Sequence, residues 1–344
     1  MIILISWSFN ERNYYRLGID VLEKKEINFK ILNLFDLLYP DQKEINNGRI
    51  YHKNEIIIKS YKEFLRYINS NELLLNFLNI KKKTLPIFIL LTMFNKKYIS
   101  FDNMPLPTIE NKKLEYLNYL FKSAYIGAVV DKKHGFPFSK KTNFIYINSI
   151  DYDTYLRFEK ENNKPLLNNN YIVFIDQNLP YHLDFIRNNE KPYVTDKNYY
   201  KSLNKFFDYI ENKYNKEVVI ALHPNSANKH QFNKKCFINE TINLIKHSDS
   251  VLLHSSTAVS FAIIYDKSIC MIETDEIIKS QMHKFNYLLS SILNLNLFNI
   301  DNIFDIEFKK GNYEYYKNKY VSKSSNNLLS MEILLKELDG FIFK

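Results

Sequence analysis

The chain has 344 residues, which is long for one domain and comfortable for two, and its hydrophobic share of 46% lets each half bury a core. The net charge of +9 suits an anionic partner such as nucleic acid, an anionic lipid surface or a phosphorylated substrate. The sequence holds no known nucleic-acid motif and no basic stretch longer than Lys81–Lys83, which excludes nucleic acid and favours peripheral contact with an anionic membrane.

The cysteines and the apolar runs indicate the compartment. Cys236 and Cys270 lie far apart and follow no metal-ligand spacing, which fits a reducing compartment. The first residues read as a strand and carry no basic lead, so no signal peptide is predicted. The longest apolar run, 85–94, is too short to span a bilayer and is expected to be a buried strand. We therefore expect a cytoplasmic protein associated with the inner face of the membrane.

The first half of the chain alternates predicted strands and helices from its first residue. Strands are predicted over 2–6, 29–34, 86–92, 125–130 and 143–147. Helices are predicted over 13–25, 55–80 and 112–122, and a polar loop over 7–12. A strand, a helix and a strand in succession are typical of a parallel α/β sheet.

The second half repeats this order. Strands are predicted over 171–176, 218–222, 251–254 and 269–272, and helices over 198–214, 240–246 and 257–265. The chain is thus expected to be α/β, with two Rossmann-like domains and a central cleft. Domains are predicted over 1–150 and 151–325, with a hinge in the Asn-rich stretch 162–170 and a helix over 326–344 that packs back on the first domain.

Ligands of such sheets bind beyond the carboxyl ends of the strands, and two motifs lie at such positions. In the first motif, a buried strand leads into Ser255, Ser256 and Thr257 at the start of a predicted helix. Ser255 or Ser256 is expected to cap that helix, and the free N–H groups with the three hydroxyls would bind a phosphate. The alternative interpretation is a plain N-cap without a ligand.

The second motif is His223-Pro224-Asn225, which follows a predicted central strand. Pro224 ends the strand and makes the turn rigid. An imidazole at this position can donate to a phosphate or stabilise a leaving nucleotide as charge develops on it. The alternative is a structural histidine at a strand end.

Together, His223-Pro224 and Ser255-Ser256-Thr257 resemble the HP and S-S/T motifs of bacterial sialyltransferases and related transferases that use CMP-activated sugars. The wider text, including Ile150-Asp-Tyr-Asp-Thr-Tyr155, is similar to proteins of bacterial surface-polysaccharide clusters. The resemblance covers about 150–275. It implies a GT-B transferase in which both motifs contact the CMP moiety, with a surface glycan as acceptor and no cofactor beyond the donor substrate. The acidic pair followed by Gly that holds the general base in sialyltransferases is not found here.

A general base is therefore sought among carboxylates of the first half, because an acceptor hydroxyl must lose a proton. Glu11 lies in the loop after the first strand, and Asp131 follows the strand 125–130. Either residue can serve. The structural alternatives are a helix-terminal carboxylate for Glu11 and a solvated loop for Asp131.

Two further loops are expected to meet the donor. Asp176 and Gln177 follow the first strand of the second half, together with Tyr181 and His182, and Asp176 can equally be a turn residue and His182 a helix cap. Glu273 follows the strand 269–272, with Thr274 and Asp275, and can reach a ribose or a base.

Asp151-Tyr152-Asp153 resembles the DXD motif with which GT-A enzymes hold a divalent cation. It lies at the predicted domain join, whereas His223 and the Ser-Ser-Thr segment belong to the GT-B architecture. We therefore interpret it as a hinge or cleft-rim element and expect no metal requirement.

Three other functions remain open on the sequence. The first is a GT-B transferase that uses a UDP- or GDP-sugar, which six glycines and no Gly-rich loop argue against mildly. The second is a nucleotide-sugar epimerase, which would act on its substrate without an acceptor. The third is a glycan-binding assembly protein, which would not hydrolyse a donor.

Overall fold

The structure of the protein is a computed structural model with two compact units. It describes residues 1–7, 9–41, 49–103, 107, 113–133, 135–161, 163–168, 170–182, 185, 190–224, 226, 230–302, 305–323 and 327–342. The first unit holds the described residues up to 156, apart from Pro107, together with those from 322 onward. The second unit holds those of 157–321. Each unit is described by itself.

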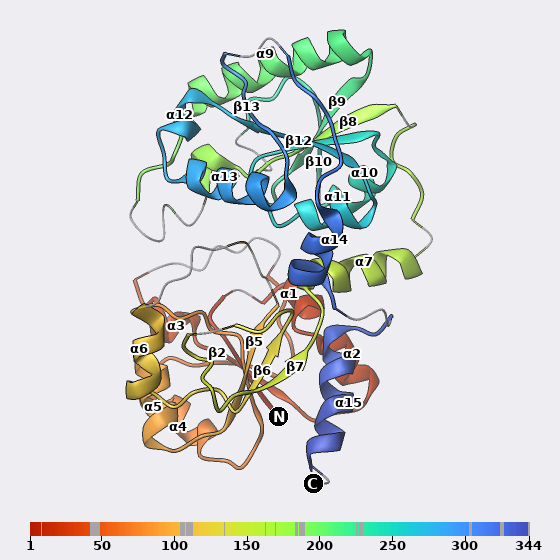
Figure 1. The fold of residues 1–344 in the computed structure, drawn as a ribbon. Helices are drawn as coiled ribbons and strands as arrows, with labels where there is room; N and C mark the ends of the chain where they lie inside the picture. Colours follow the sequence, from red (N-terminus) through yellow and green to blue (C-terminus); the bar gives the residue numbers. More distant parts are fainter. Residues whose placement is uncertain are drawn as a thin grey trace. The chain divides into compact units, whose positions relative to one another are not determined.

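The first unit is built on a seven-stranded parallel sheet with the strand order β3-β2-β1-β4-β5-β6-β7 (Figure 1). Its strands are β1 (Ile2–Ile5), β2 (Lys30–Asn33), β3 (Glu55–Ile57), β4 (Leu74–Asn76), β5 (Tyr98–Asp102), β6 (Ile126–Val129) and β7 (Asn143–Tyr146). Its helices are α1 (Glu11–Arg16), α2 (Ile19–Lys24), α3 (Phe35–Leu38), α4 (Tyr61–Ile68), α5 (Leu85–Met93), α6 (Lys113–Leu120) and α15 (Ser330–Ile342), and α7 (Ile150–Lys160) leads out of it.

Helices cover both faces of this sheet, which is why its strands are continuous apolar runs. Phe64 of α4 and Phe88 of α5 belong to the core on one face. Leu22 of α2 and Leu334 of α15 belong to the core on the other face. The C-terminal helix α15 thus completes the first unit, where it packs against α2.

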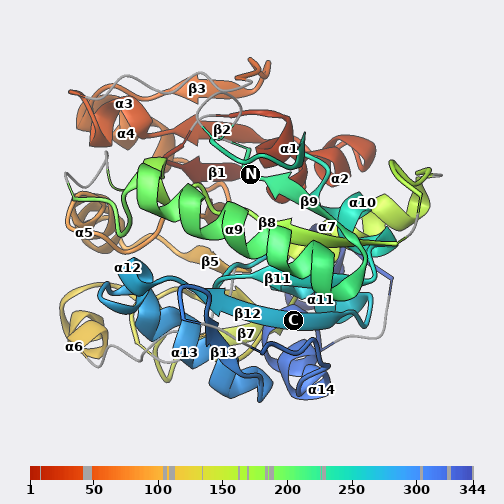
Figure 2. The ribbon, with the colours of Figure 1, turned by 90° about the horizontal axis from the view of Figure 1, so that it is seen from above.

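The second unit has a six-stranded parallel sheet with the order β10-β9-β8-β11-β12-β13 (Figure 2). Its strands are β8 (Tyr171–Ile175), β9 (Glu217–Leu222), β10 (Lys235–Ile238), β11 (Ser250–Leu253), β12 (Ser268–Glu273) and β13 (Leu297–Asn299). Its α-helices are α9 (Asp196–Tyr214), α10 (Thr241–His247), α11 (Val259–Ile264), α12 (Asp275–Ile278), α13 (Met282–Leu293) and α14 (Tyr313–Tyr316), and its other helical turns are η1 (Leu179–Tyr181) and η2 (Lys317–Val321). The strands predicted over 171–176, 218–222, 251–254 and 269–272 are confirmed.

The prediction of one helix over 55–80 was wrong, because this segment holds β3, α4 and β4. The apolar residues before and after α4 come in unbroken runs, which fit buried strands better than a helix face. Between them, Ser60 caps α4 by accepting a hydrogen bond from the Glu63 N–H (3.2 Å). This serine was the local signal for a separate, short helix.

The prediction of a strand over 86–92 was also wrong, because the apolar run forms helix α5. Pro86 lies in the first turn of the helix, where the missing N–H costs nothing. A short run that is apolar on all sides has no periodicity with which to distinguish a strand from a helix. The strand of this region is β5, which was not predicted.

The helix predicted over 13–25 is divided into α1 and α2 at Gly18, whose φ is +68°. A Cβ at this position would lie 2.6 Å from the Cβ of Met331 in α15. Glycine therefore permits both the left-handed turn and the close approach of the C-terminal helix. Among the described residues, no helix is long and apolar enough to cross a membrane.

Candidate nucleotide site at the carboxyl edge of the second sheet

The strand order of the second sheet reverses at β8, whose neighbours are β9 on one side and β11 on the other. In open α/β sheets, ligands bind in the crevice beyond the carboxyl ends of the strands at such a switch point. The His223 turn follows β9, Asp176 and Gln177 follow β8, and Ser255 follows β11. The sheet thus brings the two predicted motifs to the same edge, on either side of β8.

Asp176 fastens the His223 turn to the end of β8. Its carboxylate is buried, and Oδ2 accepts hydrogen bonds from the His223 N–H (3.2 Å) and the Ser226 hydroxyl (2.8 Å). Oδ1 accepts a hydrogen bond from the Asn178 N–H (2.9 Å). Burial raises the pKa of Asp176 above its ordinary value, and these three hydrogen bonds oppose that shift. Asp176 therefore positions the turn, and Asn225 within it lies outside the described residues.

Replacing Asp176 with asparagine should loosen this turn and alter the pH dependence of stability. The amide can accept on one side only, so a buried N–H loses its partner at about 1–3 kcal/mol. Because the folded state raises the pKa of Asp176, the wild type loses this carboxyl's contribution as pH rises from the ordinary value through the raised one. The advantage of the wild type over Asp176→Asn in urea unfolding should therefore shrink with rising pH. Parallel pH profiles would contradict this.

Gln177 joins the end of β8 to the turn after β11. Its side-chain Nε2 donates a hydrogen bond to the main-chain oxygen of Ser255. Its Oε1 is buried and has no hydrogen-bond partner among the described residues. The amide therefore bridges the switch point and presents an acceptor there that a ligand or a water molecule can satisfy.

The turn over residues 255–257 is held by main-chain contacts and lies before helix α11. The Ser255 N–H donates to the side chain of Asn286 (2.8 Å), and Ser256 Oγ accepts from the Ala258 N–H (3.3 Å). The predicted helix cap was wrong for α11 itself, because α11 begins at Val259 and its N-cap residue is Ala258, whose own side chain makes no capping hydrogen bond. Since α11 has six residues, the turn's hydroxyls and N–H groups, rather than a long helix dipole, are what the turn offers to a phosphate.

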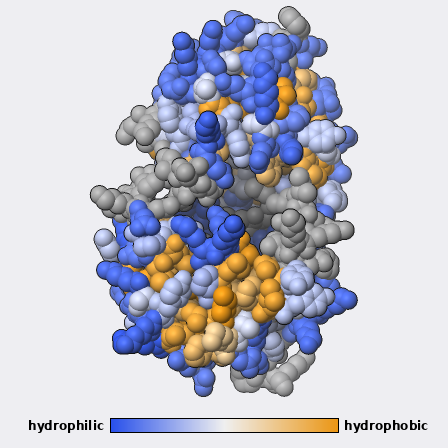
Figure 3. All heavy atoms as spheres, turned by 90° about the vertical axis from the view of Figure 1, so that its left-hand side faces the viewer, coloured by the Kyte–Doolittle hydropathy of each residue, from blue (hydrophilic) through white to orange (hydrophobic). Residues whose placement is uncertain are grey.

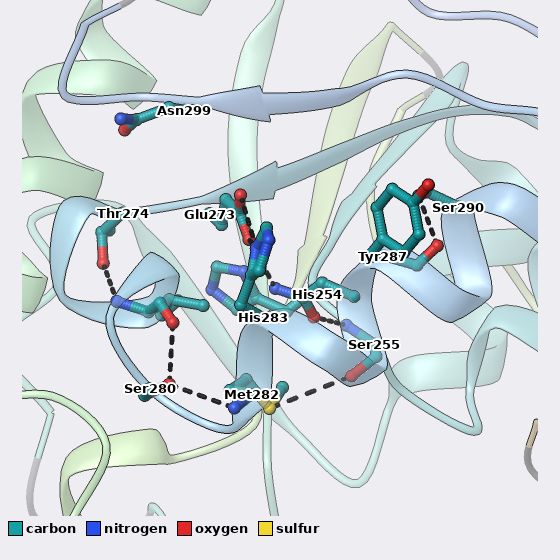
Figure 4. A network of polar contacts seen from close by, with 12 residues as sticks. His254, Ser255, Glu273, Thr274, Ser280, Met282, His283, Tyr287, Ser290 and Asn299 are labelled. Carbon is teal, nitrogen blue, oxygen red and sulfur yellow. Dashed lines mark hydrogen bonds and ion pairs between the residues drawn. The ribbon is translucent and has the colours of Figure 1, made fainter. Parts of the chain in front are cut away.

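A polar cluster with two buried members, Asn286 and Glu273, supports the Ser255 turn, and Figure 4 shows Glu273 and His283 of this cluster near Ser255. Asn286 of α13 is fully buried, and its Nδ2 donates to Glu273 Oε2 (3.4 Å) at the end of β12. The other donor to this buried carboxylate is His283 Nδ1, 2.9 Å from Oε2 and 3.1 Å from Oε1. Asn286 thus connects the turn after β11 with Glu273.

Asn286 and His283 were not found in the sequence, although a signal for Asn286 exists. Asn286 follows Met282 by four residues and precedes Leu289 by three, which places a polar side chain on the buried face of α13. A polar residue on such a face needs a hydrogen-bond partner inside the protein. The helix itself was not predicted, so this pattern was missed.

The remaining residues of these loops have local roles. Thr274 caps α12 by accepting from the Ile277 N–H (3.3 Å), and Asp275 accepts from the side chain of Asn299 (2.7 Å). The Tyr181 hydroxyl donates to Asp196 (2.8 Å). The ring of His182 lies 5.5 Å, between centroids, from that of His223. His182 is thus the aromatic neighbour of the predicted catalytic imidazole.

His254, which comes directly before the Ser255 turn, is a structural residue. It is fully buried, its Nδ1 lies 2.6 Å from the Ile272 oxygen, and its Nε2 lies 3.1 Å from the Tyr199 hydroxyl. Burial lowers the pKa of His254 to about 4, so the ring is neutral at physiological pH. It then donates through Nδ1 and accepts at Nε2, which fixes the base of the turn.

The candidate bases lie in the first unit, at the carboxyl ends of its strands. Glu11 is the exposed first residue of α1. Asp131 follows β6, accepts from the Lys132 N–H (2.9 Å) and forms an ion pair with Lys323. Asp102, the last residue of β5, is a third carboxylate at this edge and pairs with Lys133. It was missed because β5 was not predicted.

Asp151 and Asp153 lie in the first turn of α7 rather than in a loop. Asp153 is buried, and its carboxylate accepts from the side chain of Asn148 (3.0 Å) and from the Ser330 N–H (3.1 Å). It therefore anchors the start of α15. Within the described part of the chain, no three His, Cys, Asp or Glu residues gather in a way that could hold a metal ion.

Comparison with solved structures identifies the class of fold. The two parallel-sheet units have the GT-B fold. This confirms the fold class predicted from the sequence. No protein-family model and no curated protein sequence matches the chain.

Three solved structures illustrate the likeness. The H444N variant of the wall teichoic acid polymerase TagF has 10% identity and a TM-score of 0.50, over 100% of this chain and 90% of that one. The spinosyn forosaminyltransferase SpnP has 8% identity and a TM-score of 0.50, over 100% and 99%. The complex of Staphylococcus aureus MnaA with UDP has 10% identity and a TM-score of 0.49, over 100% and 98%. At these identities the likeness concerns the fold alone.

Proposed function

We propose that the protein is a glycosyltransferase that binds the phosphate of a nucleotide-activated sugar at the carboxyl edge of its second sheet. The observation that carries the proposal is the link across β8, where Asp176 holds the His223 turn and Gln177 holds the Ser255 turn. Buried polar side chains that connect two strand-end turns at a switch point are well suited to keep a ligand site in shape. The resemblance of both turns to the HP and S-S/T motifs supports the same assignment.

The residue roles follow from their chemistry. As the bond between the sugar and the donor phosphate breaks, the imidazole of His223 would donate a hydrogen bond to the leaving phosphate. The hydroxyls of Ser255, Ser256 and Thr257 would bind phosphate oxygens. The acceptor oxygen bonds to the sugar carbon, and its proton passes to a carboxylate of the first unit, for which we propose Glu11 or Asp131. Pro224, Asn225, Gln177 and Glu273 complete the proposed nucleotide contacts, with Asp176 as their support.

For the donor we propose a CMP-activated acidic sugar of the sialic or nonulosonic type, and for the acceptor a precursor of a bacterial lipopolysaccharide, lipooligosaccharide or capsule. Both rest on the sialyltransferase resemblance over about 150–275. We expect no cofactor besides the donor substrate, and a cytoplasmic enzyme at the inner face of the membrane. The alternative functions are a UDP- or GDP-sugar transferase and an epimerase. The donor assays below distinguish them from the proposed function.

Thermal unfolding with a panel of nucleotides tests the donor class. A ligand that binds only the folded protein raises the melting temperature, and at a hundred times its dissociation constant it adds about 2.7 kcal/mol to the free energy of unfolding. We expect CMP and CDP to raise the melting temperature more than UDP, GDP or ADP does. A larger shift with UDP would replace the CMP donor by a UDP-sugar. Conversion of a sugar nucleotide without any acceptor would indicate an epimerase.

Transfer in the presence of excess chelator tests whether a metal is required. The buried carboxylate of Asp153 accepts hydrogen bonds from Asn148 and Ser330, so it is not positioned as a cation ligand. We expect the rate of sugar transfer to stay within about twofold of the untreated enzyme, since charge on the leaving group is stabilised by side-chain and main-chain donors. Loss of transfer that Mn²⁺ or Mg²⁺ restores would contradict this expectation.

A further inference from the structure

Helices α5 and α6 of the first unit expose a band of apolar and aromatic side chains. On α5, Ile87 and Phe88 are buried against the sheet, while Met93 on the outer side is 73% exposed. On α6, Tyr119 is 86% and Leu120 56% exposed. The other exposed members of this band are Ile89, Phe94, Tyr116 and Tyr125. Figure 3 shows apolar residues gathered on the face of the first unit that carries these helices. We name the band, with its neighbouring lysines, the α5–α6 surface.

The two helices form one surface because their carboxyl ends are bonded together. The Lys122 N–H donates to Thr92 Oγ1 (2.7 Å), and Lys122 Nζ donates to the Asn95 oxygen (2.7 Å). Beside this junction, Lys97 Nζ lies 4.8 Å from the centroid of the Tyr125 ring. Met93 and Leu120, each next to this junction in sequence, therefore belong to a continuous exposed band.

The positive charge of the chain is concentrated at this surface. Residues 73–101 and 113–130, which hold both helices, contain seven lysines and one acidic residue, Glu115, whereas the whole chain has a net charge of +9. Besides Lys113, the first residue of α6, the lysines are Lys81, Lys82, Lys83, Lys96, Lys97 and Lys122. Lys81–Lys83 precede the amino end of α5, and the other three follow the carboxyl ends of α5 and α6. Lysines thus lie at both ends of α5 and beyond the carboxyl end of α6.

We propose that the α5–α6 surface docks on an anionic lipid membrane. Apolar side chains that enter the headgroup boundary, tyrosines at that level and lysines that pair with anionic headgroups are the combination that holds a protein on a membrane surface. A second copy of the chain is a poor occupant, because it would bring one set of lysines against another. The proposal goes beyond donor chemistry, since binding to vesicles requires no nucleotide sugar.

The position of the surface relative to the first sheet follows from the order of the elements. Tyr125 precedes β6, and Lys96 and Lys97 precede β5, so these residues lie at the amino-terminal edge of the first sheet. The carboxyl edge, where Glu11, Asp102 and Asp131 lie, is the opposite one. Lys81–Lys83 follow β4 and lie toward that carboxyl edge, so the α5–α6 surface extends along the outer side of the sheet from one edge to the other.

Flotation of the full chain with lipid vesicles tests the proposal. We expect binding to vesicles of phosphatidylcholine with about a third phosphatidylglycerol, at least tenfold weaker binding to pure phosphatidylcholine, and weakening by salt. The double variant Lys82→Glu and Lys97→Glu should bind anionic vesicles at least tenfold more weakly. The double variant Met93→Ser and Leu120→Ser should do the same, because it removes the apolar contact.

Matched controls separate docking from general charge and folding effects. Lys24→Glu with Lys25→Glu makes the same charge change on exposed positions around the end of α2, and Leu166→Ser makes a single apolar-to-serine change at an exposed position of the second unit. Both control proteins should bind vesicles like the wild type, and all variants should keep their melting temperatures because the altered side chains are exposed. Equal binding by surface and control variants, or no binding of the wild type to anionic vesicles, would overturn the proposal. So would a dimer that the Met93→Ser, Leu120→Ser variant loses.

Discussion

Replacing His223 with alanine should lower turnover by about a hundredfold or more while leaving the melting temperature nearly unchanged. The turn is held through the main-chain N–H of His223, which donates to Asp176, and alanine keeps that N–H. The side chain is only partly buried, so its removal creates little cavity. If the imidazole stabilises the leaving phosphate, its loss affects the transition state more than the bound donor. The rate of transfer at saturating donor and acceptor measures this.

His247→Ala is the matched control for that experiment. His247 is also partly buried and lies in the second unit, at the end of α10 just before β11, and thus at the amino edge of the sheet. It should leave turnover within about twofold of the wild type. If His223→Ala instead lowers the melting temperature while turnover at low temperature stays normal, His223 is a structural strand-end residue. The transferase proposal would then lose its main residue.

Most of the second unit could be predicted because its central strands have a clear sequence pattern. Its central strands contain short apolar runs bounded by polar loops, as in 171–175 and 251–253, and its long helix α9 has a clear amphipathic period. Polar turn residues on both sides of a short apolar run indicate a buried strand, and a one-sided apolar period indicates a surface helix. The edge strands β10 and β13 were missed, since they have only four and three residues and neither is buried.

The secondary structure of segment 55–101 was predicted wrongly for a physical reason. Helix α5 is apolar on its outer side as well as its inner side, so the run lacks the polar face by which a surface helix is recognised. With the run assigned as a strand, β5 and its terminal Asp102 were lost. Exposed apolar residues such as Met93 obscured the helix pattern, and they are the residues that we propose for membrane contact. Departures from the usual sequence pattern of a surface helix are expected at functional surfaces.

The candidate site was predictable where its residues follow strands and unpredictable where they support it from a distance. His223 and Ser255 stand directly after buried strands, and the sheet does bring both to one edge. Asn286 lies on a helix, not at the end of a strand, so the strand pattern does not indicate its neighbours. It is separated from Ser255, to which it is hydrogen-bonded, by 31 positions of sequence. Only the three-dimensional fold reveals such a contact.

Replacing Asn286 with leucine should cost about 2–5 kcal/mol of unfolding free energy and should also weaken nucleotide binding. The side chain is fully buried, and leucine is close to it in size on a face shared with Met282 and Leu289, so packing changes little. Two polar groups lose a partner, however: the Ser255 N–H and the Glu273 carboxylate. Urea unfolding measures the first effect, and titration with CMP at a temperature where the variant is folded measures the second.

Asn243→Leu separates a general loss of stability from an effect on the site. Asn243 is a buried asparagine of α10 in the same unit, and its amide donates to the Lys164 oxygen (3.1 Å). This control should lose stability but keep the CMP affinity of the wild type, because Lys164 is in the chain segment before β8, at the sheet's amino edge. If Asn286→Leu is as stable as the wild type, the polar cluster does not stabilise the Ser255 turn, and leucine simply packs on the apolar face of the helix. If Asn286→Leu is destabilised but binds CMP as tightly as Asn243→Leu does, the Ser255 turn does not hold the nucleotide, and the donor site must lie elsewhere on the sheet edge.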